Sequence, residues 1–176
     1  MNCAEYLVDF LINKGITDIF GFSGGYIVPF IDALARRDEI RVHVCYNEQG
    51  CAFAANGYAR VSGKLGVYFT TSGPGAVNAL GGLADAWFDG IPLMAICGNV
   101  PTTEQKGYSG IRQNGFQEMD IVSMTRAITK YSVTPSTPEK FPEILDRAYN
   151  LAMMGRKGGV IIDFPFDIQK TDINCG

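Results

Sequence analysis

Segments with the apolar spacing of helices alternate, from one end of the chain to the other, with short apolar segments typical of strands. The strand-like segments are 18–22, 41–46, 66–71, 92–97, 128–134 and 160–164. Helical spacing is found between them, at 3–14, 28–37, 49–61, 75–88, 118–124 and 138–151. Strands and helices that alternate with short connections form a parallel sheet covered by helices on both faces. We therefore predict an α/β fold in three layers, α/β/α, with a mainly parallel sheet.

The length of the chain, 176 residues, fits one domain of ordinary size. We place this domain at 1–170, because the segment 171–176 is polar and resembles the start of a linker or tail. Glycine is frequent, at 21 residues, and charged residues are few, at 19%. This combination predicts backbone that approaches a ligand closely and a surface that is partly covered by partners.

Charge and hydropathy argue against two classes of partner. The net charge is −3 and no run of Lys and Arg is present, so we expect no binding to nucleic acid. The longest apolar run, 91–97, is too short to span a membrane, and acidic residues stand at the N-terminus where a signal peptide carries basic ones. We therefore expect a cytoplasmic domain that does not bind a membrane.

Histidine and cysteine offer little for metal binding. The chain has one histidine, His43, and five cysteines that are scattered without a C-x-x-C motif. We expect no metal site and no histidine-based catalytic triad on this chain. The cysteines are interpreted as small buried apolar residues in a reducing compartment.

The segments that follow the strands contain the candidate site, because ligands of such sheets bind beyond the carboxyl ends of the strands. Glycine-rich turns follow the first and third strands, at 23–25 and 72–75, and Gly98 follows the fourth. The turn 72–75 resembles a dinucleotide-binding turn, but Asn78 stands where the third glycine is required, and no P-loop motif is present. These turns therefore indicate a ligand site of another kind.

Glu48 is the acidic residue that most invites a catalytic interpretation, because it stands where the second strand becomes a helix. Its neighbours Cys51, Ala52 and Phe53 are apolar, and such surroundings predict a raised pKa and a role as proton donor or hydrogen-bond partner. The alternative is an exposed acid that is favoured by the dipole at a helix N-terminus. The residues alone leave both interpretations open.

Several segments, in order along almost the whole chain, match one family. They are 21–25, 47–49, 54–60, 71–78, 84–87, 91–93, 115–120 and 125–130. The chain resembles the N-terminal, pyrimidine-binding domain of thiamine-diphosphate enzymes, and within them the acetolactate synthase group. Ser23 departs from the pattern, because the family often has proline there, and the loop 108–114 has no close match.

The resemblance implies roles for individual residues. The glutamate matching Glu48 binds N1′ of the cofactor's aminopyrimidine and stabilises the tautomer that takes the proton from C2 of the thiazolium. The residues implied to line the pyrimidine pocket or lie near the reacting carbon are Gly24, Gly25, Thr71, Gly73, Pro74 and Asn78. Gln117 matches an active-site glutamine and Phe116 adjoins it. Lys130 matches a lysine near the substrate entrance.

The second half of such an active site is not found in this chain. The resemblance implies that Mg²⁺ and the diphosphate of thiamine diphosphate are held by a G-D-G…N segment on a second domain, and no G-D-G occurs here. The diphosphate-binding domain would be a partner, in the same chain or as a second subunit. The resemblance also implies a homodimer or larger homo-oligomer, with the alanine-rich helix 49–59 at the interface. We expect the isolated chain to be inactive.

Three functions are consistent with these residues. The first is one domain of an acetolactate-synthase-like enzyme, which decarboxylates pyruvate and ligates the product to a second 2-oxo acid in branched-chain amino acid biosynthesis. The second is the small subunit of a two-subunit 2-oxo acid decarboxylase that acts on sulfopyruvate or phosphonopyruvate. The third is a non-catalytic interaction module of the same fold. The segment containing Phe116 and Gln117 favours the first, and Glu48 with its pyrimidine-lining residues argues against the third.

Overall fold

The computed structural model describes residues 1–107 and 109–173, and its centre is one six-stranded sheet. The strand order is β2-β1-β3-β4-β6-β5, and every pair of neighbouring strands is parallel. The strands are β1 (Asp18–Gly21), β2 (Arg41–Val44), β3 (Gly66–Thr70), β4 (Leu93–Asn99), β5 (Tyr131–Val133) and β6 (Gly159–Pro165). The predicted α/β fold with a parallel sheet is confirmed.

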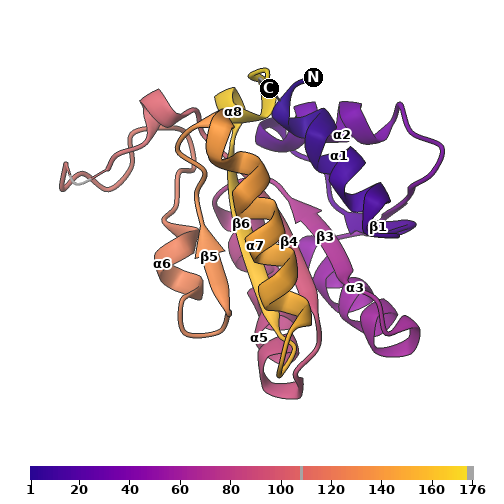
Figure 1. The fold of residues 1–176 in the computed structure, drawn as a ribbon. Coiled ribbons are helices and arrows are strands. Elements are labelled where there is room, and N and C mark those ends of the chain that lie inside the picture. Colours follow the sequence, from indigo (N-terminus) through magenta and orange to yellow (C-terminus); the bar gives the residue numbers. More distant parts are fainter. Residues whose placement is uncertain (108, 174–176) are drawn as a thin grey trace.

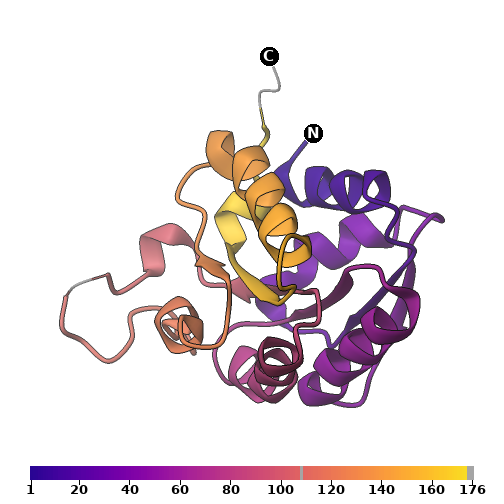
Figure 2. The ribbon, with the colours of Figure 1, turned by 60° about the horizontal axis from the view of Figure 1, so that its bottom comes forward.

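Helices cover both faces of the sheet (Figures 1 and 2). One face packs against α1 (Cys3–Asn13), α2 (Val28–Leu34), α7 (Phe141–Met153) and α8 (Phe166–Lys170). The other face packs against α3 (Glu48–Ser62), α4 (Pro74–Asn78), α5 (Leu80–Asp89) and α6 (Ile121–Thr125). Short 3₁₀ segments lie at Gly25–Ile27, Thr102–Glu104 and Pro138–Lys140.

The central strands are buried on both faces, and their side chains alternate between the two apolar clusters. In β6, Val160 and Ile162 pack into the cluster with α1 and α7, whereas Ile161 packs into the cluster with α3 and α5. All residues of β3, β4 and β6 are buried. This explains why these segments read as continuous apolar runs, as is typical of parallel strands covered on both sides.

The helix expected over 75–88 is divided into α4 and α5. At Ala79, ψ is −6°, and the Ala79 N–H bonds to the carbonyl of Ala76, three residues back, at 3.2 Å. This tighter turn redirects the chain. Beyond it, Gly82 packs directly on α3, where an added Cβ would lie 2.6 Å from the Cβ of Ala52. The division therefore lets α5 approach α3 closely.

Packing at the C-terminal end continues past the expected domain boundary at residue 170. The Cys3 N–H donates to the carbonyl of Thr171 at 3.0 Å, and the Ile173 N–H donates to the carbonyl of Met1 at 2.9 Å. Asn2 and Asp172 form an isolated antiparallel bridge. Residues 171–173 therefore belong to the folded unit, and residues 174–176 of the expected linker lie outside the described residues.

Candidate functional site

The residues singled out in the sequence gather at the carboxyl ends of β2, β1 and β3, which are adjacent in the sheet. Glu48 begins α3 immediately after β2, Gly24 lies in the turn after β1, and Thr71 and Gly73 follow β3. Because parallel strands end at the same edge, segments distant in sequence are brought together here.

Glu48 is the first residue of α3, and its position is fixed by a helix cap. The side chain of Asn47 accepts a hydrogen bond from the Gly50 N–H at 2.7 Å. Glu48 is half-buried, and its Oε2 accepts a hydrogen bond from Asn78 Nδ2 at 2.7 Å. No hydrogen bond to Oε1 is found among the described residues. One carboxyl oxygen is thus held in place, and the other is available to a ligand.

Glycines bring the three segments into contact with one another. A Cβ on Gly24 would lie 2.4 Å from the Cβ of Thr71, and one on Gly75 would lie 2.9 Å from Thr71 Cγ2 and 3.1 Å from Glu48 Oε1. Gly25, by contrast, has no atom within 4 Å of such a Cβ. At Gly24 the close approach is therefore between two parts of the protein.

Gln117 reaches the same place from the long loop after β4. Its φ is 55°, which is uncommon for a residue other than glycine. A Cβ on Gly73 would lie 2.2 Å from the carbonyl oxygen of Gln117, so the two backbones are in direct contact. Gln117 and its neighbour Phe116 are exposed, as is Pro74, the first residue of α4. The structure thus places Gln117 beside the turn that follows β3.

The loop that carries Gln117 is held by contacts within itself. Gly115 packs on Val100, where an added Cβ would lie 2.7 Å from Val100 Cγ1. The Glu118 carboxylate accepts hydrogen bonds from the N–H groups of Lys106, at 2.7 Å, and Asn114, at 2.9 Å. Sequence analysis did not assign a role to Glu118; the signal was an acidic residue directly after Gln117 in a polar loop.

A buried carboxyl group fixes the start of this loop. Asp163 Oδ2 accepts hydrogen bonds from Asn99 Nδ2, at 2.7 Å, and from Thr134 Oγ1, at 2.8 Å. Asn99 Oδ1 in turn accepts from the Val100 N–H at 2.7 Å. Burial raises the pKa of Asp163 to about 7, against the lowering effect of its two hydrogen bonds. Sequence analysis missed this residue, although an acid within the apolar run of β6 was a visible signal.

We expect Asp163 to make stability depend on pH. Because its pKa is about 7 in the folded chain and near 3.8 when unfolded, the folded state binds the extra proton between these values, and the free energy of unfolding falls as pH rises through this window. Between pH 5 and pH 8 the free energy of unfolding should fall by about 2–3 kcal/mol more in the parent chain than in the Asp163→Asn variant. Urea unfolding of both proteins at the two pH values measures this difference. Parallel pH profiles for the two proteins would contradict the prediction.

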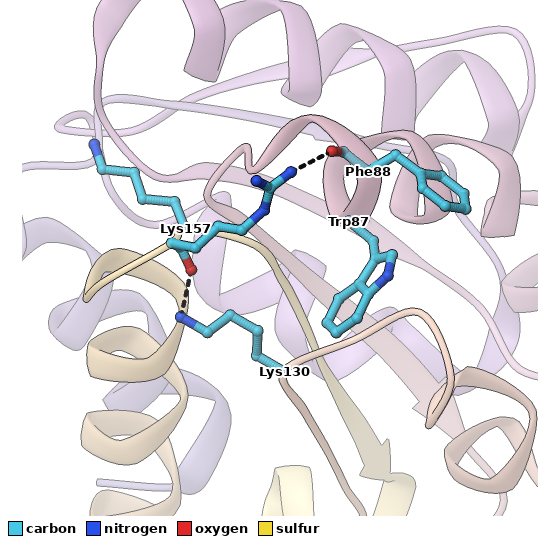
Figure 3. A pocket seen from close by; sticks show the side chains of 5 residues that line it. Trp87, Phe88, Lys130 and Lys157 are labelled. Atoms are coloured by element: carbon cyan, nitrogen blue, oxygen red, sulfur yellow. Dashed lines mark hydrogen bonds between the residues drawn. The ribbon is translucent and has the colours of Figure 1, made fainter.

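Lys130 does not lie with these residues. It precedes β5, at the opposite edge of the sheet from Glu48, and its Nζ donates to the carbonyls of Met154, at 2.7 Å, and Arg156, at 2.8 Å. Figure 3 shows the pocket of about 300 Å³ that it lines with Trp87. The structure therefore does not bring Lys130 beside Glu48, Thr71 and Gln117.

Neither a metal-binding cluster nor a membrane-spanning helix is found in the described residues. No group of three or more His, Cys, Asp and Glu side chains is arranged there to hold a metal ion. Among the helices at 1–107 and 109–173, none is both long enough and apolar enough to cross a bilayer.

Comparison with known proteins shows the protein family to which this chain belongs. Residues 1–124 match the family described as thiamine pyrophosphate enzyme, N-terminal TPP binding domain. The match covers well over half of the chain, and the chain belongs to this family of thiamine-diphosphate-dependent enzymes.

Similar proteins are acetolactate synthases. The enzyme of Arthrospira platensis is 42% identical over 171 residues, which are 96% of this chain and 28% of that protein. The large subunit of isozyme 2 of Escherichia coli K12 is 43% identical over 169 residues, 96% of this chain and 30% of that protein. The chloroplastic enzyme of Arabidopsis thaliana is 44% identical over 167 residues, which are 95% of this chain and 24% of that protein. The chain thus spans about a quarter to three-tenths of the length of these relatives.

Proposed function

We propose that this chain is the pyrimidine-binding half of a thiamine-diphosphate-dependent enzyme of the acetolactate synthase type, which decarboxylates pyruvate and ligates the remaining fragment to a second 2-oxo acid. The observation that carries the proposal is the half-buried carboxyl of Glu48, held through Oε2 by Asn78 at the edge where Thr71 and Gln117 also lie. The names of the relatives favour this function over a two-subunit decarboxylase or an interaction module.

The residues present fit the aminopyrimidine of the cofactor. A ring nitrogen can share a proton with a carboxyl oxygen that has room for another hydrogen bond, and Glu48 Oε1 is such an oxygen within the described part of the chain. A Cβ added at Gly75 would lie 3.1 Å from this oxygen and 2.9 Å from the methyl carbon of Thr71, so an apolar group is close to the carboxyl. These features support Glu48, Thr71, Gly73, Pro74 and Asn78 as the pyrimidine-binding residues.

When bound, thiamine diphosphate supplies a nucleophilic carbon and an electron sink for the loss of CO₂. The chain's own contribution would begin at Glu48, whose Oε1 would share a proton with N1′ of the ring. Asn78 keeps the carboxyl oriented by donating to Oε2. Gly24 and Gly25 border the site from the turn after β1, and Gln117 and Phe116 border it from the loop, where they would contact the 2-oxo acid.

We further propose that the diphosphate and Mg²⁺ are bound by a separate domain, in the same polypeptide or as another subunit. The charged end of the cofactor then contributes nothing to binding by this chain alone. We expect no turnover of pyruvate and no tight binding of thiamine diphosphate to the isolated chain in a calorimetric titration with Mg²⁺. Micromolar affinity for the isolated chain would contradict this division of the cofactor between two domains.

The test of the proposed function is reconstitution. This chain, joined to or mixed with a diphosphate-binding domain that holds Mg²⁺, should release CO₂ from pyruvate and form acetolactate, and both products can be quantified. Release of CO₂ without a ligated product would identify a simple decarboxylase instead. No reaction, with cofactor binding intact, would overturn the proposal of a catalytic domain.

The face formed by α3 and α5 is the surface we propose for contact with a second copy. Two alanines of the helix expected at this interface, Ala52 and Ala55, are buried within the chain. Larger side chains are exposed on these two helices: Phe53 on α3, and Trp87 and Phe88 on α5. These aromatic residues, rather than the alanines, support the proposed homo-oligomer.

A further inference from the structure

A long polar side chain is completely enclosed near the C-terminal end of the fold. Gln169 lies in α8, which begins directly after β6 at the carboxyl ends of the strands (Figure 1), and its exposed fraction is 0%. Its Nε2 donates hydrogen bonds to the carbonyl of Tyr26 and to the carbonyl of Phe164, each at 2.8 Å. Because a carbonyl oxygen only accepts, the NH₂ group of the amide must be the group that faces both.

The two hydrogen bonds serve different parts of the chain. Phe164 is five residues before Gln169, so this bond is local and joins α8 to the end of β6. Tyr26 is 143 residues away, in the 3₁₀ segment that forms part of the turn after β1. A helix that only had to be attached to its own strand would not need the second bond. The bond to Tyr26 therefore links the C-terminal helix to the turn after β1.

The interior retains Gln169 although part of its amide is unsatisfied. Its Oε1 is buried and has no hydrogen-bond partner within the described residues. An acceptor buried in this way destabilises the folded state. Methionine is also long and unbranched and would fill the same space without a buried polar group. Packing alone thus does not account for a glutamine here, whereas its pair of N–H donors does.

The turn that Gln169 holds is in direct contact with the ends of β4 and β3. A Cβ added at Gly98 would lie 2.3 Å from the carbonyl oxygen of Tyr26, so the turn lies on the backbone at the end of β4. A Cβ on Gly24 would lie 2.4 Å from the Cβ of Thr71, in the segment after β3. Because Tyr26 is only two residues from Gly24, a shift of its carbonyl would change the contact between Gly24 and Thr71.

We propose that Gln169 is a positioning residue for the turn of Gly24 and Gly25, which it holds at the edge where Glu48 and Thr71 lie. An added Cβ at Gly25 would meet no atom within 4 Å, so this part of the turn borders open space rather than protein. The proposed function makes this turn a border of the active site, and the effect on catalysis rests on that function. The hydrogen bond to the turn does not.

Hydrogen exchange tests the hold on the turn without cofactor or turnover. The Ile27 N–H donates to the carbonyl of Gly24 at 3.2 Å, so its exchange reports on the turn. In Gln169→Met, the amides of residues 22–28 should exchange about 5–10-fold faster than in the parent chain, because the turn has lost its hydrogen bond to α8. The amides of β4 should exchange as they do in the parent. Mass spectrometry of peptic fragments measures both.

The matched control is Ile168→Val, which changes the same helix without touching the amide of Gln169. Ile168 is buried in the apolar cluster of α1 and α7, and this substitution removes one methyl group from it. Exchange at 22–28 should stay at the parent rate. Equal acceleration in both variants would show that α8 supports the turn only through general packing, and it would overturn the specific role of Gln169.

Turnover of the enzyme assembled with a diphosphate-binding domain tests the catalytic consequence. Gln169→Met should lower the turnover number by about 10–100-fold, because a small displacement of a segment that borders the reacting groups is costly. The affinity for thiamine diphosphate should not change, because the hydrogen bond between Asn78 and Glu48 does not involve Gln169. A merely structural role would weaken both together. Ile168→Val should keep the turnover of the parent.

Two results would overturn the proposal: exchange at 22–28 that is unchanged in Gln169→Met, and full turnover in the same variant. If circular dichroism shows that Gln169→Met does not fold, Gln169→Glu takes its place, because its protonated carboxyl still donates one hydrogen bond. Exchange at 22–28 should then rise above that of Ile168→Val as pH increases and the carboxyl loses its proton. An assembled parent enzyme without turnover would count against the proposed function, and the exchange rates would still decide whether Gln169 holds the turn.

Discussion

Replacing Glu48 with glutamine is expected to lower the turnover number of the assembled enzyme by about 10²–10⁴-fold, the usual contribution of a positioned proton-transfer group. Glutamine has nearly the same shape, and its side-chain oxygen can still accept the hydrogen bond that Asn78 donates to Oε2. What it cannot do is accept or release a proton at the position of Oε1, because its amide group does not ionise near neutral pH. The measurement is the turnover number at saturating thiamine diphosphate and Mg²⁺, with the cofactor affinity measured in parallel.

The control for this variant is Glu104→Gln, which makes the same chemical change on an exposed acid in the loop after β4. It should leave turnover unchanged. A Glu48→Gln enzyme that keeps full turnover would remove Glu48 from the mechanism, and it would favour the interaction module among the functions considered. A variant that loses turnover together with its folded circular dichroism spectrum would be replaced by Glu48→Asp, which tests the same proton with a shorter side chain.

The order of the strands and helices followed from the apolar spacing, because the core requires it. Strands buried on both faces, such as β4 and β6, must be apolar throughout, and α1 shows its capping box of Asn2 and Glu5 as a local pattern. The division between α4 and α5 could not be predicted in this way. It depends on how closely Gly82 packs on Ala52, a contact between elements that are distant along the chain.

The site was predictable to the extent that it follows strand ends. Glu48 and Thr71 stand directly after strands, so their meeting follows from a parallel sheet. Gln117 lies on a long loop without periodicity, and only the resemblance to a family indicated its place. Asp163 and Glu118 escaped prediction because their roles depend on partners far away in sequence, Asn99 in one case and the N–H of Lys106 in the other. Lys130 lies at the other edge of the sheet from Glu48, and a short motif match does not by itself fix the edge at which a residue lies.

Replacing Gly73 with alanine is expected to have the second large effect, on both stability and turnover. Its φ of 57° is a conformation that residues with a side chain rarely adopt, and the new methyl carbon would lie 2.2 Å from the carbonyl oxygen of Gln117. Backbone strain costs about 1–3 kcal/mol, and the overpacked contact about 1–3 kcal/mol more. Urea unfolding of the isolated chain, with and without Gly73→Ala, measures the sum of these two costs as a loss in the free energy of unfolding.

Gly155→Ala is the comparison for a positive φ without a clash, because Gly155 has a φ of 62° and no atom within 4 Å of an added Cβ. The difference between the two variants is then an upper limit for the cost of the contact with Gln117, because the ψ of −124° at Gly73 adds backbone strain of its own. Gln117 could instead move away from the new methyl group and relieve the contact. The free energies of unfolding of the two variants will then be close, but turnover will fall only for Gly73→Ala. A shift of about 1 Å at a residue that positions substrate can cost about 100-fold in rate. Equal unfolding energies together with equal turnover would show that the loop and the turn after β3 are not coupled, and Gln117 would then lose its support as an active-site residue.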